Sequence, residues 1–276
     1  LGRSISQLRI PRVSPVINAR VRWQQFLETL KLNITYVIKS IPFLAILAMG
    51  ILFVIIYTAQ AQQIYGTPVQ PVTYHLAGFI GQSFMVFFLI LITFYAGELY
   101  WKERDYNLSG IKDALPVPTW VNMAGQYAAL VTVLAGILVV LMLTGIGIQL
   151  SQGFFDIEIS TYLTILFIDN FPPLVEFTLL AFFIHVLVNN KFMGHALVIL
   201  FFLLVSIGFP QMNLEHNLYL FASTPGFTYS GMNGTGPFLE GLAWFHVYWF
   251  AFSLILSGLG YLLWQRGAVD AFRERL

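Results

Sequence analysis

Cysteine and charge are what this sequence has least of. Its 276 residues include no Cys, and only 10% of them are charged. Disulfides and thiolate metal sites are therefore excluded. In a soluble domain about a quarter of the residues are charged. The few charges here cannot cover the surface of a soluble protein of this size, so lipid must cover much of the surface. The content of 58% hydrophobic residues and the mean hydropathy of +0.75 agree. The net charge of +1 gives no sign of a nucleic-acid partner.

Signatures of nucleotide-binding and hydrolytic enzymes are also missing from the sequence. It contains no G-x-x-x-x-G-K-[ST] phosphate-binding loop. It also contains no H-E-x-x-H zinc motif, because none of the five histidines is followed by Glu. It contains no G-x-S-x-G nucleophile elbow either. We therefore expect that this chain is not itself an enzyme and that it holds no cofactor or metal of its own.

Long apolar runs dominate what is present. A spanning helix needs about 20 predominantly apolar residues, and six runs come close to that length or exceed it. They cover residues 41–61, 79–100, 119–149, 161–188, 193–209 and 241–265. We predict an all-α, multi-pass membrane protein with a six-helix transmembrane bundle over 41–265. Since the first residue is Leu1, we read the chain as processed or as one segment of a longer polypeptide.

The fourth run contains a helix-start signal in its middle, Asp169-Asn170-Phe171-Pro172-Pro173. One straight helix is possible, but the two prolines favour a break. We expect a spanning helix over 171–188, with Asp169 as its cap and residues 154–168 as a separate segment.

The segment before the first run predicts an amphipathic helix. Within 19–40 the apolar side chains recur at helical spacing, with basic residues between them. We expect this helix to lie in the membrane interface, although a soluble helix packed on another domain would show the same pattern. Residues 1–40 are therefore a cytoplasmic N-terminal segment, and 266–276 a cytoplasmic tail.

The placement of positive charge predicts the orientation. Lys and Arg stay on the cytoplasmic side of short loops. With six spans and a cytoplasmic N-terminus, all 14 Lys and Arg fall inside, and the outer loops 62–78, 150–160 and 210–240 contain none. A different span count would destroy this pattern. We expect both termini in the cytoplasm and location in a bacterial inner membrane.

The loop after the second span is the longest cytoplasmic connection between spans. It begins with Glu98, Glu103, Arg104 and Asp105, and then places Leu108, Ile111 and Leu115 at helical spacing. A short amphipathic helix of this kind can insert into a groove on a soluble partner. A solvated connecting loop would look the same.

Two stretches resemble a known family. The sequence GELYWKERDYNLSGIKDALPVPTWV, which starts at Gly97, is similar to the corresponding segment of ABC-2-type permeases. The pair Tyr229–Gly234 and Trp244–Trp249 resembles bacterial permeases of that family that are fused elsewhere to a zinc aminopeptidase. The resemblance extends over most of the chain.

The resemblance implies a transmembrane half that pairs with a second half. It also implies a separate cytoplasmic ATPase that binds ATP and Mg²⁺ and docks on residues 102–117. Glu98, Glu103, Arg104 and Asp105 would then couple the second span to that ATPase. From charge alone, we expect Glu98 to pair with Lys102 or Arg104.

Few ionisable groups lie inside the spans. Glu176 is the deepest acid, and such a group usually marks a function or a partner. His185 and His195 flank a tight turn and are expected to approach each other, but two histidines are too few for a convincing metal site.

The outer segment 210–240 is rich in Gly and Pro, so we expect it to fold back onto the outer membrane face. There Tyr229, Met232 and Asn233 would form a gate loop, or part of an ordinary ordered loop.

Three functional hypotheses follow. The first is an ABC-2 permease half that works by alternating access. The second is a non-transporting membrane anchor for a catalytic or assembly partner. The third, an ion-coupled transporter or channel, would have several intramembrane charges and internal repeats, and the sequence offers only one deep acid.

Overall fold

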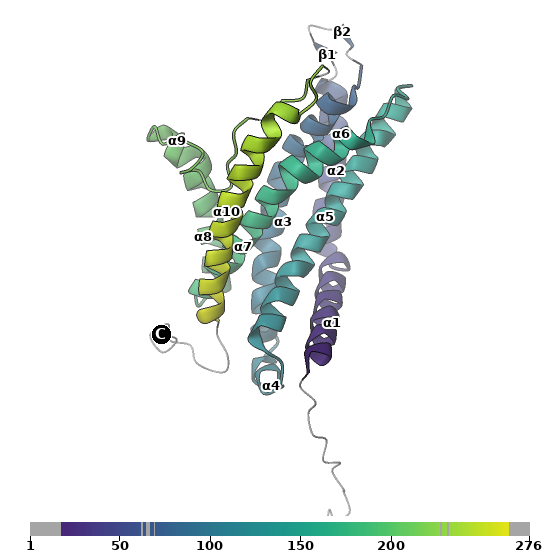
Figure 1. Cartoon of the computed structure of the whole chain (residues 1–276). Coiled ribbons are helices and arrows are strands. Elements are labelled where there is room, and N and C mark those ends of the chain that lie inside the picture. The colour runs from purple at the N-terminus through teal and green to yellow at the C-terminus, as the bar shows by residue number, and fades with distance from the viewer. Residues whose placement is uncertain are drawn as a thin grey trace, which may run out of the picture.

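A computed structural model describes residues 18–61, 63–64, 67–68, 70–226, 228–230 and 232–264. Within them, six helices are long and apolar enough to cross a membrane, so the predicted all-α six-span bundle is confirmed (Figure 1). Four of these spans are single helices: α2 (Ile41–Ala61), α3 (Thr73–Asp105), α5 (Thr119–Ser151) and α10 (Gly236–Leu262). The fourth span along the chain consists of α6 (Ile159–Leu163), the π-helix η2 (Thr164–Asn170) and α7 (Phe171–Leu187). The fifth consists of α8 (Lys191–Leu203), the π-helix η3 (Leu204–Gly208) and α9 (Phe209–Gln211).

Helix α3 lies at the centre of the bundle, where it packs against α2, α5, α7 and α8. Its buried face is large and apolar because bulky side chains such as Ile80, Phe84, Phe88 and Tyr95 follow helical spacing. At 1.5 Å per residue, the 33 residues of α3 span about 50 Å, which exceeds the hydrocarbon core of about 30 Å. Part of α3 is therefore too long for the hydrocarbon core, and its charged last turns are the part best suited to water.

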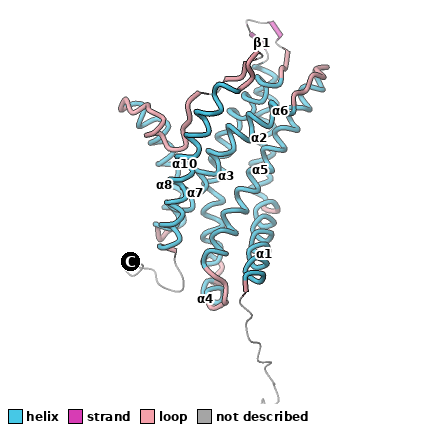
Figure 2. The backbone as a smooth tube through the Cα atoms, viewed as in Figure 1, coloured by secondary structure: helices cyan, strands magenta, loops and turns pink. Residues whose placement is uncertain are grey.

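Helices α2, α8 and α10 form the periphery. Most of their large apolar side chains are exposed in the single chain, among them Leu52 on α2, Leu200 on α8 and Ile255 on α10. Exposed apolar side chains along a span are expected where lipid or a second membrane subunit covers them. Figure 2 shows that loops gather at the two ends of the bundle, away from this belt.

The fourth span differs from its prediction, because it is not broken at the two prolines. The helix runs from Ile159 to Leu187, with the π-helical segment Thr164–Asn170 just before Pro172. A proline removes one N–H donor and crowds the carbonyl four residues earlier, and a wider π turn accommodates both effects. Asp169 therefore lies inside a continuous helix, and its predicted role as a cap is wrong.

The N-terminal helix α1 (Ala19–Ile38) also differs from its prediction. Within α1 only Asn33 and Val37 are buried, whereas the apolar side chains of Trp23 and Leu27 are exposed, so the predicted apolar face is only partly covered. In addition, α1 packs lengthwise along the first half of α5 and does not cross the spans, as an interfacial helix would (Figure 1). Gly125 of α5 allows this close approach, because a Cβ atom there would lie 2.7 Å from Cγ2 of Thr29.

All basic side chains of the described residues gather at one end of the bundle, which we call the basic end. There α1 packs on α5, and the short helix α4 (Ser109–Asp113) joins α3 to α5. The eight residues are Arg20, Arg22, Lys31, Lys39, Lys102, Arg104, Lys112 and Lys191. The other six Lys and Arg, together with most of the predicted N-terminal segment and the tail, lie outside the described residues.

The opposite end holds the described parts of three connections, which are 63–64, 67–68 and 70–72 in the first, 152–158 in the second, and 212–226, 228–230 and 232–235 in the third. The first of these contains a two-residue antiparallel pair, β1 (Gln63–Ile64) and β2 (Thr67–Pro68), in which Gln63 faces Pro68 and Ile64 faces Thr67. In the third, an isolated bridge joins Ser230 to Gly234.

Candidate functional site

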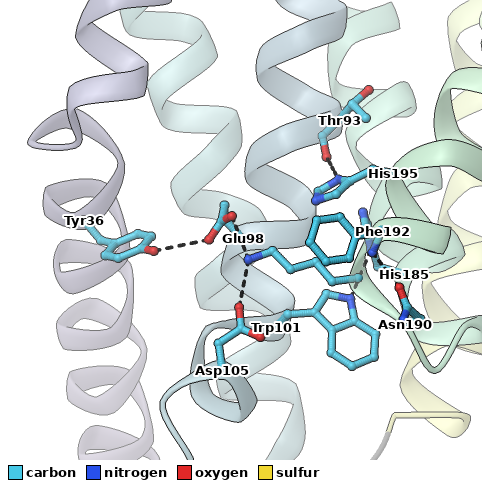
Figure 3. Close-up of polar contacts among 10 residues, drawn as sticks. Tyr36, Thr93, Glu98, Trp101, Asp105, His185, Asn190, Phe192 and His195 are labelled. Carbon is cyan, nitrogen blue, oxygen red and sulfur yellow. Dashed lines mark hydrogen bonds and ion pairs between the residues drawn. The ribbon is translucent and has the colours of Figure 1, made fainter.

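An ion-pair cluster at the basic end joins three helices (Figure 3). Lys191, the first residue of α8, places its Nζ atom 2.7 Å from Oε1 of Glu98 and 2.8 Å from Oδ2 of Asp105. The two acids are seven residues apart on α3 and therefore lie on the same face of that helix. Tyr36 of α1 donates to Oε2 of Glu98 at 3.5 Å. We call these four residues the Lys191 cluster.

The cluster is only partly accessible to water. The side chains of Lys191 and Glu98 are 19% and 18% exposed, whereas that of Asp105 is 43% exposed. Burial, with a further contribution from the Glu98 carboxylate, raises the pKa of Tyr36 to about 12. Tyr36 therefore stays protonated at neutral pH and remains a hydrogen-bond donor to Glu98.

The predicted partners of Glu98 are wrong. Lys102 instead donates to Oδ1 of Asn33 on α1 at 2.8 Å. The guanidinium group of Arg104 lies over the rings of Tyr100 and Trp101, at 5.0 and 4.8 Å from their centroids. Six residues along an α-helix rotate the side chain by about 240°, which turns Arg104 away from Glu98.

The predicted coupling loop forms a hairpin beyond the end of α3. Glu103 makes an ion pair with Lys112, which holds α4 against the end of α3. The predicted short helix is present as α4, and Leu108, Ile111 and Leu115 are 49%, 69% and 52% exposed around it. Glu98 and Asp105 thus meet at Lys191, whereas the three apolar residues project into water as a separate surface.

His185 of α7 and His195 of α8 lie together above the Lys191 cluster, as predicted, with ring centroids 5.0 Å apart. Trp101 Nε1 donates to Nδ1 of His185 at 3.2 Å, so a neutral His185 carries its proton on Nε2. Nδ1 of His195 is 3.0 Å from the carbonyl oxygen of Thr93. In the described part of the chain no three His, Cys, Asp or Glu residues are grouped to hold a metal ion.

Two glycines make room for these histidines. A Cβ atom at Gly97 would lie 2.3 Å from Cε1 of His195 and 2.8 Å from Cε1 of His185. A Cβ atom at Gly194 would lie 2.2 Å from Nδ1 of His185. Small residues allow membrane helices to approach closely, and here they bring α3, α7 and α8 together next to the ion pairs.

Glu176 lies in the interior of the bundle, nine residues or about 13 Å along α7 from His185. Its side chain is 1% exposed, and its Oε1 atom is 3.7 Å from Nδ1 of His246 on α10. Neither carboxylate oxygen has a hydrogen-bond partner among the described residues. A buried acid of this kind is costly in a membrane protein, which makes Glu176 a candidate functional residue apart from the basic end.

The three residues predicted as an outer gate are not one unit. Tyr229 donates to Oε2 of Glu158 at 3.2 Å and stacks on Tyr74, so it is held against the bundle. Met232 is 94% exposed, and Asn233 is exposed beside it.

Lys191 and Tyr36 are the cluster members that sequence analysis missed. Lys191 is the only basic residue between the apolar runs 161–188 and 193–209 of the sequence, and its isolation there is the feature from which it could have been identified. The participation of Tyr36 depends on the unexpected orientation of α1.

Comparisons of the chain with known family models, curated proteins and solved structures give no match.

Proposed function

We propose that this chain is one membrane-spanning half of an ABC-2-type exporter in a bacterial inner membrane. In this proposal a separate cytoplasmic ATPase binds ATP and Mg²⁺, and a second transmembrane half, identical or related, completes the transporter. The observation that carries the proposal is the α4 hairpin, which presents three exposed apolar side chains directly at the end of the central helix.

The connections of the hairpin favour a mechanical role. The Glu103–Lys112 ion pair ties α4 to α3, and α3 packs against four other spans. The Lys191 cluster then joins the end of α3 to the start of α8 and to α1. A force applied to α4 by an ATPase would therefore reach the bundle through packed helices and ion pairs, without a long flexible linker.

The same arrangement suggests how alternating access would work. ATP-driven closure of two ATPase subunits would move two α4 hairpins together and shift each bundle between inward-open and outward-open states. A nucleotide shifts such an equilibrium only through its different affinity for the two states. Glu176 and His246, deep in the bundle, are the residues that we expect to lie along or next to the translocation path.

Co-purification with ATPase measurement tests the proposal. The native complex is extracted in maltoside, the associated proteins are identified by mass spectrometry, and ATP turnover is measured. We expect a stoichiometric P-loop ATPase, which Ile111→Asp removes because a charge would enter the docking groove. Met232→Asp, a change at an exposed apolar residue of the opposite end, should leave the complex intact.

The opposite result points to the alternative function. If no ATPase accompanies the chain, or if its binding and turnover are unaffected by Ile111→Asp, the exporter proposal is wrong. A different stoichiometric partner that Ile111→Asp releases would then indicate a membrane anchor, because the hairpin would still be the docking element.

A further inference from the structure

A polar pocket lies at the end of the bundle opposite to the basic end. It is an open pocket with a volume of about 570 Å³, lined by the first turns of α3, by η2 and by the outer connection near Thr228. The lining residues that carry polar or aromatic groups include Tyr74, His75, Gln82, Asp169, Asn170 and Tyr229. The pocket has no part in the proposed coupling to an ATPase.

The π turn of the fourth span positions the acidic wall of this pocket. Asn170 Nδ2 donates to the carbonyl oxygen of Ile165, five residues earlier, at 2.9 Å. Gly81 lets α3 approach this turn, because a Cβ atom there would lie 2.6 Å from Nδ2 of Asn170. Both Asp169 and Asn170 line the pocket. Single π-helical turns inside α-helices occur frequently at functional sites.

Among the described residues, no hydrogen-bond or ion-pair partner explains the place of Asp169 in a span. No hydrogen bond or ion pair joins its carboxylate to another of the described residues. His246 is close enough to act on it electrostatically, but that imidazole lies nearer the buried Glu176. An acid at this position is costly in a membrane protein unless a counter-charge, a ligand or a water-filled cavity compensates it, and Asp169 lines an open pocket that such a ligand could enter.

Aromatic rings form another wall of the pocket. The rings of Tyr74 and Tyr229 are stacked with centroids 5.0 Å apart, and Phe79 also lines the space. The hydrogen bond from Tyr229 to Glu158 fixes one ring in place. The faces of such rings attract cations, and aromatic walls are the usual means of recognising quaternary ammonium groups.

The surrounding charges are all of one sign. The described residues at this end include no Lys or Arg, whereas Asp156, Glu158, Glu215 and Glu240 lie in or beside its connections. The field around the pocket therefore favours a positive ligand and disfavours an anion.

We infer that this pocket binds a small organic cation, with the positive nitrogen next to the Asp169 carboxylate and its carbon substituents against the rings of Tyr74, Phe79 and Tyr229. The amide groups of Gln82 and Asn170 are placed to bind a hydroxyl or carbonyl group elsewhere on the ligand. This inference is independent of the proposed exporter function, since a bound cation could be a transported molecule or a ligand of any other membrane protein.

Choline and its uncharged carbon isostere, 3,3-dimethylbutan-1-ol, are suitable probes because they differ mainly in charge. Binding is measured by saturation-transfer NMR on the full chain in uncharged maltoside micelles, which avoids competition from lipid choline groups. We expect choline to bind and the isostere to bind at least about tenfold more weakly. Asp169→Asn should lower choline affinity by a similar factor, while Glu240→Gln, which removes an acid from the same end, should have little effect.

Two variants distinguish a binding role from a structural one. Asp169→Asn has nearly the same shape as the original side chain, and its thermal unfolding is measured in parallel. Tyr229→Leu keeps Asp169 but removes one ring, and it should weaken choline more than the isostere. Equal binding of the two probes, no binding of choline, or full choline affinity in Asp169→Asn would overturn the inference.

Discussion

Lys191, the first residue of α8, lies 2.7 Å from Glu98 near the end of α3. The second acid, Asp105, is 2.8 Å from the same ammonium group. A single cation thus bridges two carboxylates of one helix and compensates part of their combined negative charge. This links the fifth span directly to the base of the α4 hairpin.

Replacing Lys191 should destabilise the bundle. In Lys191→Met two partly buried carboxylates lose their counter-charge, and we expect a loss of about 1–3 kcal/mol. This is less than for a fully buried pair, because water screens Asp105, whose side chain is 43% exposed. The midpoint of thermal unfolding in micelles measures the change. Lys191→Arg should retain most of the stability.

A double-mutant cycle with Glu98→Gln isolates the central pair. If the two changes add without a coupling free energy, Lys191 and Glu98 do not stabilise each other. The Lys191 cluster would then have no role in joining α8 to α3.

The glycines beside the histidines give a second prediction. Gly97→Ala should lower the thermal stability by about 1–3 kcal/mol, because the added methyl group overlaps both imidazole rings and the packed helices must separate. Gly136→Ala on α5 is the matched control, since no atom lies within 4 Å of a Cβ there. It should be neutral or slightly stabilising, because Ala favours a helix more than Gly does. Equal effects of the two changes would mean that the close approach at Gly97 has little importance.

Tyr36 gives a pH-dependent prediction. Its pKa of about 12 exceeds the usual value near 10, so folding favours the protonated phenol. This contribution to stability is fully present below pH 10 and is lost as the pH rises from about 10 to about 12. The difference in phenolate absorbance between the native chain and Tyr36→Phe should have its midpoint near pH 12.

Glu98→Gln provides the control for this titration. Removing the neighbouring negative charge should move the Tyr36 midpoint downward, although burial, the larger cause, would keep it above its usual value. A midpoint near 10 in the native chain would show that α1 does not pack on Glu98 in solution.

The architecture was largely predictable from apolar runs, because a membrane span must be long and apolar whatever it packs against. The ends of α3 were not predictable in this way. The apolar run covers 79–100, whereas the helix extends from Thr73 to Asp105. Its last turns are charged, and they remain helical because Lys191 and Asn33 from other helices pair with them. The continuity of the fourth span was also missed, because a π turn at two prolines leaves no distinct pattern in sequence.

The site was only partly predictable for a related reason. Sequence alone placed Glu98, Asp105 and the α4 residues at one end, but ion-pair partners depend on which helices become neighbours in space. Local partners such as Arg104 were therefore preferred over Lys191, which lies far along the chain. Glu176 was identified because a deep acid is conspicuous in any apolar run, whereas its neighbour His246 required the packing of α10 on α7.

Glu176 gives the last prediction, which separates function from stability. Its carboxylate is buried without a hydrogen bond among the described residues, and replacing such a group by an apolar one of similar size is often neutral or stabilising. Glu176→Leu should therefore leave the thermal midpoint unchanged or raise it, while ATP turnover of the intact complex and its response to substrate should fall. Thr178→Val, a change at a buried neighbour on α7 whose hydroxyl bonds only its own helix, should spare turnover. A Glu176→Leu protein that is less stable but turns over ATP normally would show that Glu176 supports the packing of α7 on α10 and takes no part in transport.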